Sequence, residues 1–126
     1  IRDSGNMPKN FVTLVKQHGA LLAKGWLLGV QFDTLFTDDL YCRIARHAND
    51  AADRIREVLV ERGYTLTFDA PTNQIFITLD NATSERLQRN VRLGFMEKAD
   101  DTHTVMRICT SWATTDEQVE QLIALL

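Results

Sequence analysis

The chain has 126 residues, of which 44% are hydrophobic and 25% charged, and its net charge is −3. This size suits one compact domain with a real interior. Lys and Arg are scattered among Asp and Glu, so no basic face offers a surface for nucleic acid. No apolar run approaches the ~20 residues that span a bilayer, and residues 1–20 lack the organisation of a cleavable signal. We therefore expect a cytoplasmic protein without nucleic-acid or membrane partners.

The stretch from Asn10 to Phe36 is dense in apolar residues and holds three glycines. Each glycine inside a helix costs ~1 kcal/mol relative to alanine, so the stretch is expected to break. The pattern predicts a short helix to about Gln17, a bend at His18–Gly19 and a second, well-buried helix to about Phe36. A helix that is apolar on most sides must be covered, which implies a partner surface.

A long helix is predicted from Asp39 to Arg62, because apolar residues recur there at steps of three and four. They are Leu40, Ile44, Ala48, Ala51, Ile55 and Leu59. Thr37 or Asp38 suits the start as a cap, and Gly63 suits a left-handed end. The opposite face is charged and is expected to be solvated.

After Gly63 the apolar period changes to two, which predicts strands over residues 64–68 and 75–79 across a turn at 69–73. A short helix over 82–88, strands over 91–97 and 103–110, and a last helix follow. Thr114 with Glu117, or Thr115 with Gln118, fits a capping box for that helix. The fold class is therefore α+β: long N-terminal helices lead into a small domain, a mostly antiparallel sheet with helices packed on one face.

The two cysteines, Cys42 and Cys109, stand far apart in the sequence, without a C-x-x-C motif or clustered histidines. We expect both to be reduced, at least partly buried and inert, because cysteine is among the most buried residue types. The three histidines lie in different predicted elements, and His47 is interpreted as a packed or surface helix residue. The sequence thus predicts no metal site and no catalytic residue within the chain.

Arg107 is the one unusual polar residue, because it lies in the middle of the apolar strand Val105–Cys109. An unpaired buried charge is costly, so the guanidinium needs a partner. It could pair with an acid on a neighbouring strand, or its head group could reach water. Alternatively, it could bind the carboxylate of a ligand. The spacing favours neither the structural nor the ligand-binding interpretation.

Four segments in register give the chain a family resemblance. They are Phe11–Gly25, Asp39–Tyr41 with Ala45–Ala48, Pro71–Phe76 and Arg107–Thr114. Together they resemble the C-terminal part of low-specificity threonine aldolases and β-eliminating lyases. These are fold-type I enzymes that use pyridoxal phosphate (PLP). The resemblance covers nearly the whole chain, and it implies that residues 1–126 form the small C-terminal domain with its preceding interdomain helices.

The resemblance also implies roles for individual residues. Arg107 matches the arginine that binds the α-carboxylate of the amino-acid substrate, and Lys24 is the best candidate for a contact with the cofactor phosphate. The lysine that carries PLP lies upstream of the segment that matches Phe11, so the cofactor would not be attached covalently to this chain. We expect the PLP domain to precede Ile1, because the opening residues look like a loop inside a longer protein.

The implied function is cleavage of β-hydroxy amino acids such as threonine to glycine and an aldehyde, with this chain inactive alone. Its expected partners are the amino-acid substrate, the N-terminal PLP domain and further copies of itself in a homo-oligomer. Two alternatives stay open: another β-eliminating amino-acid lyase, or a stand-alone domain that serves in binding or assembly without catalysis.

Overall fold

The computed structural model describes residues 5–126 and divides the chain into two compact units, residues 1–40 and 41–126. The first unit holds the helices α1 (Phe11–Gln17) and α2 (Trp26–Phe36). The chain breaks between them as predicted, with Gly19 in the left-handed region at φ +66°. Within residues 5–126, no helix is both long and apolar enough to cross a membrane.

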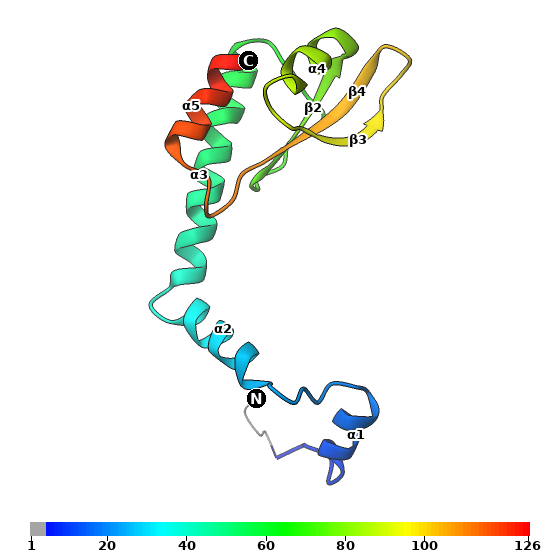
Figure 1. Ribbon diagram of the computed structural model, residues 1–126, viewed down its shortest axis with the longest axis vertical. Helices are drawn as coiled ribbons and strands as arrows, with labels where there is room; N and C mark the ends of the chain where they lie inside the picture. The colour runs from blue at the N-terminus through cyan, green and yellow to red at the C-terminus, as the bar shows by residue number, and fades with distance from the viewer. Residues whose placement is uncertain (1–4) are drawn as a thin grey trace. The chain divides into compact units, whose positions relative to one another are not determined.

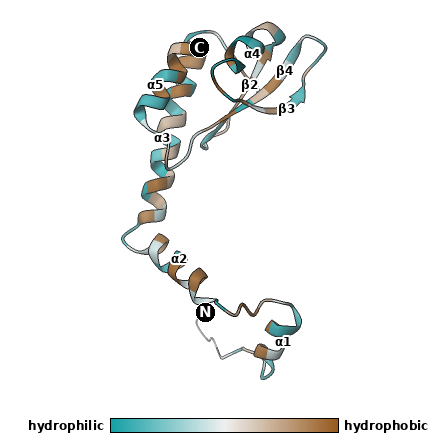
Figure 2. Cartoon of the chain, viewed as in Figure 1, coloured by the Kyte–Doolittle hydropathy of each residue, from teal (hydrophilic) through white to brown (hydrophobic). Residues whose placement is uncertain are grey.

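None of the residues of α2 is buried, so the prediction of a well-buried helix is wrong for this chain. Figure 2 shows α2 largely in the brown of hydrophobic residues. The large apolar side chains that α2 exposes are Trp26, Leu27, Leu28, Val30, Phe32 and Phe36. The dense apolar stretch and its glycines identified the helix, but burial also needs a surface that covers it, and none does so within the described residues.

Helix α3 (Leu40–Glu61) starts one residue later and ends one residue earlier than predicted. Its buried residues are Ala48, Ala51, Ala52, Ile55 and Leu59, which share one face at steps of three and four. Asp38 and Asp39, just before the helix, have φ values of 50° and 58°, in the left-handed region. At the other end Gly63 has φ +79°, and the backbone N–H of Tyr64 donates to the Leu59 carbonyl. This is the left-handed helix end predicted for Gly63.

The second unit also contains a four-stranded antiparallel sheet in the order β1-β2-β4-β3. The strands are β1 (Thr65–Leu66), β2 (Gln74–Asp80), β3 (Gly94–Lys98) and β4 (His103–Cys109). Helices α4 (Asn81–Gln88) and α5 (Asp116–Leu125) complete the unit, and Figure 1 shows α5 alongside α3. The predicted α+β class is confirmed, although β1 is shorter than the predicted strand over 64–68.

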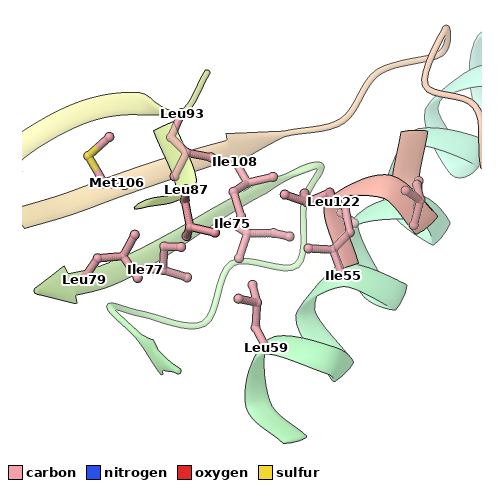
Figure 3. Packing of buried hydrophobic residues seen from close by; sticks show 13 residues of the cluster. Ile55, Leu59, Ile75, Ile77, Leu79, Leu87, Leu93, Met106, Ile108 and Leu122 are labelled. Atoms are coloured by element: carbon pink, nitrogen blue, oxygen red, sulfur yellow. The ribbon is translucent and has the colours of Figure 1, made fainter. Parts of the chain in front are cut away.

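The hydrophobic core of the second unit lies between one face of the sheet and the helices α3, α4 and α5. Figure 3 shows Ile55 and Leu59 of α3, Leu122 of α5, and Ile75 and Ile77 of β2 in this cluster. On β4, Met106 and Ile108 belong to the same cluster, whereas Arg107 between them does not. Because side chains alternate along a strand, Arg107 projects from the opposite face of the sheet.

Polar contacts fix the helices around this core. The Thr115 hydroxyl accepts from the Gln118 N–H, and the Gln118 side chain accepts from the Thr115 N–H. This is the second of the two capping boxes considered. Arg54 on α3 forms ion pairs with Asp116 and Glu120 on α5. The start and the outer face of α5 are thereby tied to α3.

Both cysteines are free thiols, but both are exposed, so the prediction that they are partly buried is wrong. Cys42 lies in the first turn of α3, away from the stretch of that helix that enters the core. Cys109 lies two residues after Arg107 and therefore projects from the same uncovered face of the sheet. A strand with one covered face places only every second residue in the core, and Cys109 is among the others.

Candidate functional site

Arg107 lies at the centre of the sheet face that the helices leave uncovered, which we call the open face. Antiparallel pairing places Phe76 of β2 on one side of Arg107 and Gly94 of β3 on the other. Directly paired residues project from the same face, so all three share the open face. A ligand of this unit would approach Arg107 from that side, because the core occupies the other.

The Arg107 guanidinium is half-buried and has one hydrogen-bond partner among the described side chains. Its Nη1–H donates to Oε1 of Gln74 at 3.3 Å. Its Nε is buried without an acceptor. A guanidinium carries five N–H donors and no acceptor, and the Gln74 amide oxygen accepts from one of the five.

An acid on a neighbouring strand was one of the alternatives for Arg107. Within residues 5–126 Arg107 forms no ion pair. The residues that lie opposite it on β2 and β3 are Phe76 and Gly94, neither of which carries a charge. The structural alternative of an internal salt bridge is therefore not realised in the described chain.

Gly94 leaves room for the Arg107 side chain. A Cβ atom built on Gly94 would lie 3.5 Å from Nε of Arg107 and 3.4 Å from its carbonyl oxygen. Alanine would thus make ordinary contacts, but a larger side chain would occupy the volume beside the guanidinium. The glycine allows the guanidinium to lie close to the backbone of β3.

The ends of β2 and β4 beside this site are firmly joined. Asn73 Nδ2–H donates to the Thr110 carbonyl at 2.7 Å, and the Thr110 N–H donates back to the Asn73 carbonyl at 3.0 Å. The buried Thr110 hydroxyl donates to the Ala48 carbonyl of α3 at 2.6 Å. Because buried hydrogen bonds are costly to break, these contacts hold the two strand ends and α3 in one arrangement.

Lys24, the other predicted site residue, lies in the first unit, in the turn before α2. Its side chain is exposed, and its carbonyl accepts from the Leu27 N–H at 3.1 Å. Within residues 5–126 no hydrogen bond or ion pair of its ammonium group occurs. Lys24 and Arg107 thus belong to different units.

The described residues do not fit a covalent PLP site. All four lysines of the chain are exposed: Lys9, Lys16, Lys24 and Lys98. None of them lines any of the five main hollows on the described surface. A lysine that forms a Schiff base is normally desolvated in a pocket, which deprotonates it. No such environment exists for a lysine within residues 5–126.

The largest of these hollows, about 550 Å³, is polar and includes Asp80, Asp100 and His103 in its lining. Its side chains have structural partners. Asp80 caps α4 by accepting from the Thr83 N–H at 2.9 Å, which lowers the pKa of Asp80. The Thr102 hydroxyl, then the Thr102 N–H and the His103 ring, hold the pKa of Asp100 well below its usual range. These contacts close the turn between β3 and β4.

The histidines have local structural contacts. His47 is exposed on α3, and its Nε2 lies 2.7 Å from the Thr114 carbonyl oxygen, to which a ring N–H can donate. His103 contacts Asp100 in the turn described above. Among residues 5–126, no group of three or more His, Cys, Asp or Glu side chains is placed to hold a metal ion.

Gln74 is the site residue that sequence reasoning missed. It lies in the segment Pro71–Phe76 that contributed to the family resemblance, but nothing in that segment indicates a contact with Arg107. The contact depends on β2 lying beside β4, with Gln74 opposite Cys109. The signal that would have found it is the pairing register of two strands that stand about thirty residues apart.

The fold is that of the C-terminal region of fold-type I PLP enzymes: N-terminal helices, then an antiparallel sheet with helices. The solved structure of a threonine aldolase from Leishmania major is similar to the chain, with a TM-score of 0.86 and 35% sequence identity. The match covers 94% of this chain and 34% of that one. The predicted resemblance is confirmed, because the chain matches the C-terminal part of this threonine aldolase.

A second solved structure, a serine palmitoyltransferase from Sphingomonas wittichii, has a TM-score of 0.53 and 22% identity. It covers 64% of this chain and 22% of that one, and at this identity the likeness concerns the fold alone. The chain spans about a third of the length of the threonine aldolase it matches. No protein-family model and no curated protein matches the sequence.

Proposed function

We propose that the chain is the C-terminal part of a PLP-dependent aldolase that cleaves β-hydroxy amino acids such as threonine to glycine and an aldehyde. The observation that carries the proposal is the half-buried Arg107, which has no acidic partner in the described chain and an Nε without an acceptor. The match to a threonine aldolase over 94% of the chain supports the reaction class.

In this proposal Arg107 binds the α-carboxylate of the substrate. A planar guanidinium matches a carboxylate through two parallel hydrogen bonds, which fix orientation as well as distance. Holding the carboxylate restricts rotation about the bonds of the substrate Cα and thereby selects the bond to be cleaved. Phe76 lies beside Arg107 on the open face, and the half-burial of Arg107 lowers the solvent screening of such a pair.

In this proposal the cofactor chemistry is carried out by residues outside this chain. PLP supplies an electron sink for the cleaved bond when it is bound. Because no described lysine fits its covalent site, we assign the chain no Schiff-base residue, and the expected partner is an upstream PLP domain. Lys24 is proposed only as a contact to the cofactor phosphate, since its exposed ammonium is free to meet an anion. A cytoplasmic location stays our prediction.

The chain alone is expected neither to form a lysine adduct with PLP nor to cleave threonine, because its four lysines are exposed and none is desolvated. The measurement is the visible spectrum with PLP and the mass after borohydride reduction. A stoichiometric adduct at one lysine would contradict the expectation.

The full-length gene product is expected to convert threonine to glycine and acetaldehyde. The measurement is the acetaldehyde released, detected by its enzymatic reduction in a coupled assay. Release of ammonia and 2-oxobutanoate instead would favour a β-eliminating lyase. A product that contains only residues 1–126 and shows neither reaction would favour the stand-alone binding domain.

The chain is also expected to self-associate, which would fit the proposed homo-oligomer. Exposed apolar patches larger than a few hundred Å² usually mark interfaces. In the first unit Leu21, Leu22, Trp26, Leu27 and Val30 are all exposed. Sedimentation should therefore show species heavier than a monomer, and Leu27→Asp should shift them toward the monomer.

The matched control for this experiment is Val60→Asp, a similar change at an exposed residue of α3 in the second unit. It is expected to leave the association unchanged. A chain that stays monomeric at high concentration, and binds no dye specific for apolar surfaces, would count against the interface.

A further inference from the structure

We propose that Gln74 is a positioning residue of the Arg107 site. Its neutral amide orients the guanidinium without neutralising the charge that a ligand carboxylate needs. The inference rests on the proposed function, since it assigns to Arg107 the role of a carboxylate anchor. It goes beyond that function by naming the residue that sets the orientation of the planar Arg107 guanidinium.

The contact itself defines the geometry. Nη1 of Arg107 donates to Oε1 of Gln74 at 3.3 Å, from β4 to the adjacent strand β2. A guanidinium has only donors, so the amide must turn its oxygen toward it. One hydrogen bond from Nη1 removes much of the freedom of a long, flexible side chain. The remaining donors of the planar group then have a defined direction on the open face.

The neutrality of the partner matters as much as its position. A carboxylate at residue 74 would form an ion pair with Arg107 and compete with any anionic ligand for the same donors. The amide oxygen accepts one hydrogen bond and leaves the full positive charge in place. The Nε of Arg107 is buried and has no acceptor, so the guanidinium is only partly satisfied within the described chain. This is the arrangement expected of a preorganised anion anchor.

Gln74 is the first residue of β2, and hydrogen bonds hold the loop that precedes it. Its N–H lies 3.3 Å from the Thr72 hydroxyl, which can accept the hydrogen bond. From α3, Nη2 of Arg56 donates to the carbonyls of Ala70 at 2.7 Å and Thr72 at 3.1 Å. Residue 73 is joined to Thr110 by the two hydrogen bonds described above. Because the loop before β2 is fixed on both sides, the backbone that carries the Gln74 side chain has a defined position relative to Arg107.

The test uses two variants of the full-length gene product, Gln74→Glu and Gln74→Met. Glutamate keeps the shape and adds the competing charge, whereas methionine keeps the length and removes the acceptor. Gln74→Glu is expected to lower kcat/KM for threonine by about 30-fold or more, the loss typical of a charge-assisted pair. Gln74→Met is expected to lower it by about 2- to 10-fold, as for one hydrogen bond.

Two readouts separate positioning from a structural role. Threonine methyl ester carries no carboxylate, so the loss caused by Gln74→Glu should largely disappear with this substrate. The melting temperature of Gln74→Glu should stay at or above that of the wild type, because an internal ion pair with Arg107 replaces an amide contact. A merely structural residue would lose activity on both substrates in step with stability.

The matched control is Gln88→Glu, the same change of charge at an exposed residue of α4, which packs on the other face of the sheet. This control should leave kcat/KM unchanged for both threonine and its methyl ester. The inference is overturned if Gln74→Glu keeps wild-type kcat/KM on threonine, or loses as much on the ester, while Arg107→Ala is impaired. If Arg107→Ala itself keeps wild-type kcat/KM, the proposed function fails, and the two failures are thereby told apart.

Discussion

Arg107→Ala in the full-length gene product is expected to lower kcat/KM for threonine by about 30-fold to several thousand-fold. The guanidinium is half-buried, has no acidic partner in the described chain and lies on the open face between Phe76 and Gly94. Removing one member of a buried, hydrogen-bonded ion pair costs about 2–5 kcal/mol. Each 1.4 kcal/mol corresponds to a factor of ten in kcat/KM, which gives the stated range.

Arg107→Lys is the matched variant, because it keeps the positive charge and removes the planar fork. It should recover only part of the lost activity, since an ammonium cannot form two parallel hydrogen bonds with a carboxylate. PLP occupancy should be the same in both variants and the wild type, because the proposed function assigns the cofactor contacts to residues other than Arg107. Kinetics, PLP content and melting temperature are measured on the same preparations.

A purely structural Arg107 would produce a different pattern. Stability would fall, and the fraction that stays folded would show nearly normal kinetics. A folded, PLP-loaded Arg107→Ala protein with wild-type kcat/KM would remove Arg107 from the site. Loss of activity on threonine with little loss on its methyl ester would place the effect at the carboxylate.

Leu59→Ala is expected to lower the free energy of unfolding of the chain by about 2–5 kcal/mol. Leu59 is fully buried on α3 and belongs to the core cluster with Ile77 and Leu122. Truncating such a leucine loses its transfer free energy and leaves a cavity that the neighbours fill only partly. Since whole domains are stable by only about 5–15 kcal/mol, this is a large fraction of the total. Urea denaturation followed by circular dichroism measures it.

The neighbouring residue supplies the control for this measurement. Val60 is 57% exposed, whereas Leu59 is 0% exposed, although they are adjacent on the same helix. Val60→Ala is therefore expected to change the free energy of unfolding by less than about 0.5 kcal/mol. Equal losses for the two variants would mean that α3 does not present the Leu59 face to the core.

Much of the secondary structure could be predicted from the sequence, because local patterns determine it. The steps of three and four between Leu40 and Leu59 identified α3, and Gly63 identified its end. Alternation along residues 75–79 and 103–110 identified the two central strands. The wrong predictions concern strand length and side-chain burial, which depend on packing in the folded unit. Residues 64–68 formed only the short edge strand β1, and neither cysteine was buried.

The site could be predicted only in part. Arg107 was identified because a cation in an apolar strand is unusual, and the family resemblance then suggested a ligand for it. Its contact with Gln74, its unpaired Nε and the space beside Gly94 followed only from the structure. These features depend on which strands are neighbours, and a single sequence does not reveal strand order or register.

The sequence by itself therefore determined the helices, the central strands, the α+β class and the unusual position of Arg107. Each of these follows from periodicity and from the cost of burying a charge, which act over a few residues. Only the tertiary structure decided that β4 lies between β2 and β3, and that the helices cover the face opposite Arg107. Pairing across thirty residues depends on the packing of the whole unit, because every strand must bury its apolar face against the same core.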